Sequence, residues 1–142
     1  MKIALQLVAS LTLAFASLSA MAQGQPVFAV VTKTSVLPAK PSYMRGENIR
    51  IQVQASLIRL DPNGHGYNQT LVGPAPNALV YVTEMSTRGA SRFAGGRTDR
   101  NGAYTTAYRV PTDPFKDNVS VCGWALDEEP FEGQQVRLKI GR

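Results

Sequence analysis

Apolar and polar residues alternate with a period of two along several parts of the chain. The clearest case is the segment 48–57, where every second residue is apolar: Ile49, Ile51, Val53, Ala55 and Leu57. Such alternation is typical of a strand with one buried and one solvated face. Two further segments alternate in the same way, through Tyr104, Thr106, Tyr108 and Val110 and through Val136, Leu138 and Ile140. All three segments are therefore predicted to be strands.

Other apolar segments are less regular. The segments 27–34 and 78–85 are rich in β-branched residues, which favours strands covered on more than one side. The segment 119–126 has apolar residues on both faces and is predicted to be a central strand. A short strand is expected at 91–98. Helical periodicity is absent after residue 22, so we expect an all-β fold.

Turn residues separate these segments. The run 99–102 reads Asp-Arg-Asn-Gly and predicts a hairpin, because Asn-Gly readily adopts the positive φ angles of tight turns. The segment 61–77, with three prolines, is interpreted as one long irregular connection. About seven short strands at this spacing predict an antiparallel β-sandwich with Greek-key connections.

The first 22 residues have the features of an export signal. Lys2 precedes an apolar run over 3–18, and Ala20-Met21-Ala22 offers a small-residue cleavage site. We therefore expect a cleavable signal peptide at 1–22 and one domain at 23–142, in a periplasmic or extracellular location of bacterial type. The run is short for a membrane span of about 20 residues, and no later segment approaches that length. A chain that does not span the membrane after cleavage is expected.

Three segments, taken in order, carry a resemblance to a known type of domain. The segment 41–51 fits a Y-x-x-G-E-x-I-x-I pattern, 76–82 fits P-x-x-x-V-x-V, and 98–111 fits T-D-x-N-G-x-Y followed by V-P. This order resembles macroglobulin-type domains and the bacterial Ig-like domains of the invasin and intimin kind. The resemblance implies a single Ig-like sandwich and a tendency toward protein contacts. It implies no activity, since fold alone does not assign function.

No catalytic motif is recognised. His65 is the sole histidine and lies between glycines, without the nucleophile and carboxylate context that a triad needs. Cys122 is the sole cysteine, so no intrachain disulfide is expected. Its apolar neighbours favour burial over reactivity. We interpret Trp124 as a core or near-core ring, and expect exposed aromatic surface from Tyr67, Tyr104, Tyr108 and Phe131.

Metal and cofactor sites are not expected either. One histidine and one cysteine supply too few ligands for a transition metal. The runs 61–64 and 99–102 each place two oxygen ligands two residues apart, and 127–129 adds carboxylates. Calcium requires six to eight oxygens, and neither run has a terminal bidentate acid. We therefore interpret both runs as turns.

Charge is unevenly distributed along the chain, whose formal net charge is +5. Between residues 45 and 109 lie eight arginines, whereas 113–132 contains six acidic residues and one lysine. Such asymmetry can steer a charged partner. A nucleic-acid partner is not expected, because no reader motif is present. The candidate interaction surface combines the 61–77 loop with nearby cations: His65, Tyr67, Arg88, Arg92, Arg97 and Arg100.

Three functional hypotheses follow. The first is an exported accessory or structural module, not an enzyme, that binds a protein or a cell-surface component through loops at one end of the sandwich. The second is a homo-oligomeric fibre subunit, in which the apolar run 26–34 adds to a neighbour's sheet. The third is a small enzyme or ligand carrier with an unrecognised site, which would require a deep pocket with convergent polar groups.

Overall fold

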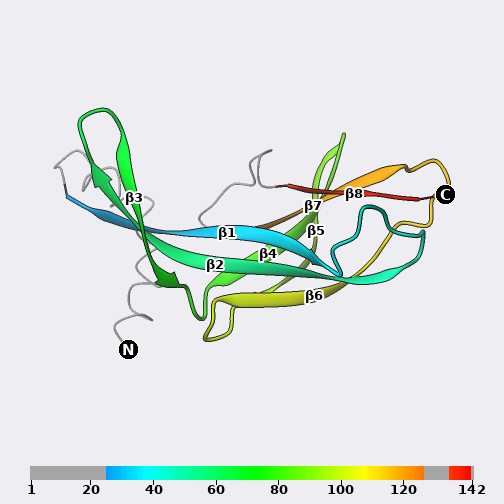
Figure 1. Cartoon of the computed structure of the whole chain (residues 1–142), viewed down its shortest axis with the longest axis horizontal. Coiled ribbons are helices and arrows are strands. Elements are labelled where there is room, and N and C mark those ends of the chain that lie inside the picture. Colours follow the sequence, from blue (N-terminus) through cyan, green and yellow to red (C-terminus); the bar gives the residue numbers. More distant parts are fainter. Residues whose placement is uncertain (1–24, 127–134, 142) are drawn as a thin grey trace.

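The computed structural model describes residues 25–126 and 135–141 (Figure 1). The expected signal peptide at 1–22 lies outside the described residues. So do the four acidic residues at 127–129 and 132. None of the described residues belongs to a helix of the length and hydropathy needed to cross a bilayer.

The described residues form eight strands in two antiparallel sheets, which confirms the all-β sandwich (Figure 1). The strands are β1 (Val27–Leu37), β2 (Asn48–Pro62), β3 (Tyr67–Pro74), β4 (Leu79–Ser86), β5 (Gly89–Arg97), β6 (Ala103–Arg109), β7 (Asn118–Ala125) and β8 (Val136–Lys139). The first sheet contains β1, β2, β3 and β6; the second has the order β5-β4-β7-β8. Neighbouring pairs such as β2–β6 and β4–β7 are not consecutive in sequence, as Greek-key crossing requires.

Strand β2 organises the first sheet. One of its edges pairs with all of β1, from Leu37 opposite Arg50 to Val27 opposite Leu60. Its other edge is divided: β6 pairs with the first half and β3 with the second. The β2–β3 hairpin consequently extends beyond the rest of the sandwich (Figure 1). At the level of the core, the first sheet is three strands wide and the second sheet is four.

The alternating apolar residues form the core between the two sheets, as the sequence predicts. Ile49, Ile51, Val53 and Ala55 of β2 face inward and are almost completely buried. They pack against the inward residues of the second sheet, which include Val80, Val82, Val121 and Leu138. Strand β7 is central, as expected, because it pairs with both β4 and β8. Each such side chain contributes about 1.5–3 kcal/mol through burial.

The two sheets approach most closely at Gly123 of β7. A Cβ atom there would lie 2.2 Å from a methyl carbon of Val53, so no larger residue fits. The ladder between β7 and β8 ends at Val121, before Gly123. Threonine hydroxyls of β1 take over: Thr32 Oγ1 donates to the Gly123 carbonyl at 3.0 Å, and the Gly123 amide donates to Thr34 Oγ1 at 2.8 Å. Strand β1 thus closes this side of the sandwich.

Two sequence expectations about connections are wrong. The segment 61–77 is not an irregular loop, because β2 continues to Pro62 and most of the remainder forms β3. The run 99–102 does form a turn, in which the Gly102 amide donates to the Asp99 carbonyl at 3.0 Å. It does not close a hairpin, because β5 and β6 belong to different sheets. Gly102 has φ 77° and lies against the Ala55 carbonyl, so the turn is a corner between the sheets.

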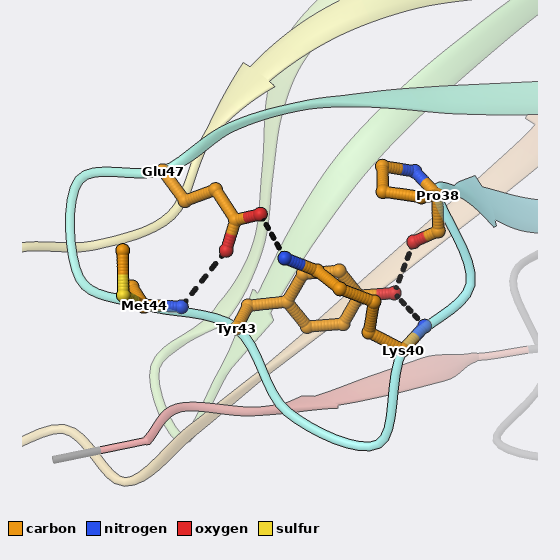
Figure 2. A network of polar contacts seen from close by, with 5 residues as sticks. All are labelled: Pro38, Lys40, Tyr43, Met44 and Glu47. Atoms are coloured by element: carbon orange, nitrogen blue, oxygen red, sulfur yellow. Dashed lines mark hydrogen bonds and ion pairs between the residues drawn. The ribbon is translucent and has the colours of Figure 1, made fainter.

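The connection from β1 to β2 is held by a polar network (Figure 2). The Tyr43 hydroxyl donates to the Pro38 carbonyl at 2.7 Å and accepts from the Lys40 amide at 3.1 Å. The Glu47 carboxylate accepts from the Lys40 ammonium and from the Met44 amide. The Lys40 hydrogen bond, followed by the Met44 amide, lowers the pKa of Glu47 below its ordinary value.

Arg45 ties this connection to the carboxyl-terminal end of the described chain. Its guanidinium donates to four backbone carbonyls, at distances of 2.8 to 3.2 Å: those of Asp113, Pro114, Lys116 and Gly141. Arg45 is therefore a structural residue, since its donors are already used inside the chain.

Candidate functional site

The outer face of the second sheet has a composition unlike that of an ordinary solvated surface. Residues that alternate with the core point outward from its strands, among them Tyr81 and Thr83 of β4 and Cys122 and Trp124 of β7. Tyr81 lies directly opposite Trp124, and Thr83 opposite Cys122. Thr83 and Cys122 are 3% and 0% exposed although they point away from the core.

A row of three side chains crosses this face through β5, β4 and β7. The Arg92 guanidinium lies over the Tyr81 ring, 3.5 Å from its centroid. The Tyr81 and Trp124 rings lie 5.0 Å apart at an interplanar angle of 45°. A guanidinium stacked in this way directs its N–H groups outward within its own plane, away from the ring. We call these three residues the Arg92–Tyr81–Trp124 row.

Arg92 has unused hydrogen-bonding capacity. It makes no hydrogen bond or ion pair with any described residue, although its guanidinium is fixed by the stacking. Trp124 Nε1 is buried and has no hydrogen-bond partner in the described part of the chain. A fixed guanidinium with free donors is suited to bidentate recognition of a carboxylate or phosphate.

Further cations flank the row. Arg97 lies on β5, with one N–H donated to the Asn77 carbonyl at 2.9 Å, and Arg137 and Lys139 are exposed on β8. Within residues 25–126 and 135–141, no carboxylate points outward from this sheet. Glu84 of β4 faces the other way, toward the Tyr108 hydroxyl and Lys116. The described part of the face is consequently basic and aromatic.

The structure does not gather the six predicted surface residues into one site. His65 and Tyr67 lie at the tip of the β2–β3 hairpin, and Arg100 lies in the corner between the sheets. Arg88 and Arg97 flank opposite ends of β5, about 30 Å apart at the usual strand rise. The expectation that these groups share one end of the sandwich is therefore wrong. Only Arg92 and Arg97 lie on the outer face of the second sheet.

The aromatic expectations have mixed outcomes. Tyr67 is exposed, as expected, whereas Tyr108 is buried at 8% exposure and Tyr104 is half-buried. Both tyrosines point between the sheets from β6. Burial and then the hydrogen bond to Glu84 raise the pKa of Tyr108. Phe131 lies outside the described residues. Trp124 is half-buried on the outer face, so it is a near-core ring and not part of the main core.

Residues considered for catalysis lie apart from one another. Cys122 is fully buried in the middle of the second sheet, which confirms its predicted burial, and His65 is exposed at the hairpin tip. The described part of the chain lines two open depressions, of about 490 and 450 Å³. The first lies beside Leu37 and Ile49, the second beside Met85 and Lys116, and neither brings a nucleophile, base and carboxylate together.

The two oxygen-rich turns use their ligand atoms internally. Asp99 Oδ1 accepts from the Asn101 amide at 2.8 Å and from the Ala103 amide at 3.0 Å. In the other turn, Asn63 Oδ1 accepts from the His65 amide, and Asp61 pairs with Arg59. Among the described residues, no group of three or more His, Cys, Asp or Glu side chains is placed to hold a metal ion.

The sequence matches no model of a known protein family, and no curated protein is detectably similar to it.

Proposed function

We propose that the mature chain, residues 23–142, is an exported binding module that contacts an acidic protein or cell-surface component through the outer face of its second sheet. The Arg92–Tyr81–Trp124 row carries this proposal. A stacked guanidinium with free donors, aromatic neighbours and flanking cations is the composition that interface centres favour. Export rests on the apolar run at 3–18 and its cleavage signal.

The proposed surface differs from the loop cluster that the sequence favours. The flat face presents fixed side chains on hydrogen-bonded strands, whereas His65, Arg88 and Arg100 lie in three separate turns. Rigid groups lose less conformational entropy on binding than groups on loops. The face is accordingly the better candidate for contact with a macromolecule.

Two observations bear on the alternatives. The run 26–34 is largely contained in β1, which pairs with β2 along its whole length. Donation of this run to a neighbouring subunit would require that ladder to open, so the fibre hypothesis has less support. Neither open depression brings a nucleophile, a base and a carboxylate together, so an enzyme or ligand carrier has little support.

Charge reversal tests the proposal. The double variant Arg92→Glu/Arg97→Glu should lower the capture of partners from a cell-envelope extract at least tenfold, roughly 1.4 kcal/mol. The matched control is Lys33→Glu/Arg59→Glu, which reverses two exposed cations of the first sheet, one on β1 and one on β2. Thermal unfolding verifies that both variants fold. Equal capture by wild type and the Arg92 variant, or equal loss in the control, would refute this surface.

A further inference from the structure

Strand β6 has a regular free edge. It pairs with β2 from Ala103 to Arg109 without a register shift, and no described strand pairs with its other side. The first sheet ends there, one strand narrower than the second. A regular seven-residue edge is a template on which another extended segment can pair.

The hydrogen-bond pattern identifies the unused backbone groups on β6. The Val110 amide donates to the Glu47 carbonyl at 2.9 Å, and the Ala55 amide donates to the Gly102 carbonyl at 2.7 Å. Because bonding direction alternates along an antiparallel strand, the even-numbered residues of β6 bond to β2. The amides of Thr105, Ala107 and Arg109 therefore point to the free side, and all three residues are exposed.

Other edges of the sandwich are less suited to strand pairing. Strands β3 and β5 are each interrupted by a register shift, and β8 has only four residues. Strand β1 carries Lys33 and is held against β7 by two threonine hydroxyls. Bulges, short strands and lysines are established ways of blocking edge pairing. Strand β6 has no bulge and no lysine, and its charged residue, Arg109, lies at its last position.

The two sides of the β6 edge have different chemistry. Toward the interior lie Tyr104, Tyr108 and Phe93, the last 39% exposed and 5.1 Å from the Tyr108 ring centroid. Toward the solvent, Arg109 lies on β6 and Arg50 lies opposite Ala107. Neither arginine forms an ion pair within the described residues. A segment added here would place alternate side chains against aromatic rings and against cations.

We propose that the free edge of β6 accepts an extended segment of a different protein, with apolar residues alternating with acidic ones, as a fourth strand of the first sheet. Backbone hydrogen bonds to Thr105, Ala107 and Arg109 hold the segment, and the alternation fixes its orientation. The apolar amino-terminal strand of this chain is already paired with β2, so a second copy has no such strand to donate. This surface is separate from the Arg92–Tyr81–Trp124 row.

The probe is a capped synthetic peptide of about eight residues in which valine alternates with glutamate, a length typical of strands. Binding to the isotope-labelled mature protein is followed by amide chemical shifts and hydrogen exchange. At saturation, the amides of Thr105, Ala107 and Arg109 should exchange at least about tenfold more slowly, while those of Tyr104 and Thr106 change little.

Two matched pairs make the test specific. Ala107→Pro removes the central free amide and should weaken peptide binding by about tenfold or more, whereas Ala107→Val keeps the amide and should not. N-methylation of the peptide residues that face β6 should abolish binding, whereas N-methylation of the alternate residues should not. The peptide pair remains informative if Ala107→Pro fails to fold. Arg92→Glu should leave peptide binding unchanged.

Several results would overturn the proposal. The first is the absence of saturable binding up to ~2 mM peptide, because such an affinity is weaker than edge pairing normally gives. The second is a set of chemical-shift changes centred on Tyr81 and Trp124. The third is an equal effect of the two N-methylated peptides. Protection of the same three amides by self-association, without peptide, would instead show that a second copy occupies the edge. None of these results bears on the capture experiment with Arg92→Glu/Arg97→Glu, so the two proposals can fail separately.

Discussion

The two outer faces of the sandwich are built from the same strand geometry but differ in chemistry. The outer face of the first sheet carries polar and charged residues: Lys33, Ser35, Arg50, Gln52, Gln54, Thr105 and Arg109. The outer face of the second sheet carries Tyr81, Thr83, Cys122 and Trp124, two of them fully shielded from solvent. A β-sandwich requires only its inner faces to be apolar. The second face therefore contains apolar residues that the fold alone does not demand.

The difference separates stability from recognition. Side chains on the first face can be exchanged at little cost, since none of those named is fully buried. On the second face, the Tyr81 ring packs against Trp124 and carries the Arg92 guanidinium, beside the buried Thr83 and Cys122. We therefore expect changes on this face to affect stability and binding together, except at Arg92 itself, which only rests on the surface.

Among the substitutions that compare the two faces, removal of the Trp124 ring is expected to have the largest effect on the free energy of unfolding. Trp124→Ala should lower the free energy of unfolding by about 2–4 kcal/mol, because a large half-buried ring is replaced by a methyl group. Gln52→Ala on the first face should cost less than about 0.5 kcal/mol. Urea denaturation followed by circular dichroism measures both, because Trp124 is the sole tryptophan and its fluorescence is lost. Similar costs at the two positions would contradict the contrast between the faces.

A smaller effect is expected at Cys122. Cys122→Ser places a hydroxyl at a position without solvent access and should cost about 1–3 kcal/mol. Thr105→Ser, on the exposed edge of the first sheet, should cost less than about 0.5 kcal/mol. The same urea experiment measures both.

Thiol labelling provides an independent check on this burial. Cys122 in native protein should react with a thiol reagent far more slowly than in urea, because the reagent reaches the buried thiol only when the sheet opens. Labelling at the unfolded rate under native conditions would mean that the second face is open to solvent.

Sequence patterns predicted the core strands because burial and alternation coincide there. In β2, Ile49 and the next three inward residues alternate perfectly, and each is buried. Strand β3 was missed because its residues are almost all exposed, so no alternation marks it. The corner at 99–102 was mistaken for a hairpin because turn chemistry is the same whether the following strand pairs with its neighbour or crosses to the other sheet.

The candidate site was harder to predict than the fold. Tyr81, Arg92 and Trp124 come from three strands, and they meet only through the register of β4 with β5 and β7. Register between distant segments leaves no local signal. One available clue was the presence of apolar residues on both faces of 119–126, which suggested a covered outer face. Grouping Arg88 with Arg97 failed because a nine-residue strand separates them.

The smallest expected effect concerns the polar network that joins β1 to β2 (Figure 2). The pKa of Glu47 lies below its ordinary value of 4.5, mainly because of Lys40, so the folded state favours the ionised carboxylate. Its contribution to stability is therefore present above about pH 4.5 and is lost as the pH falls through the lowered pKa. Between about pH 6 and pH 3, the urea midpoint of wild type should fall more than that of Glu47→Gln.

Lys40→Met provides the matched control, because it removes the main cause of the lowered pKa and should reduce the same pH dependence. Added salt should shrink the difference between wild type and both variants, since the Lys40–Glu47 ion pair is only partly buried and remains open to screening. If Glu47→Gln and wild type lose stability in parallel on acidification, this network does not contribute to stability. The outcome also bears on the faces. If the Lys40–Glu47 ion pair contributes less to the free energy of unfolding than the half-buried rings of the second sheet, then burial, and not polarity, sets the difference between the two faces.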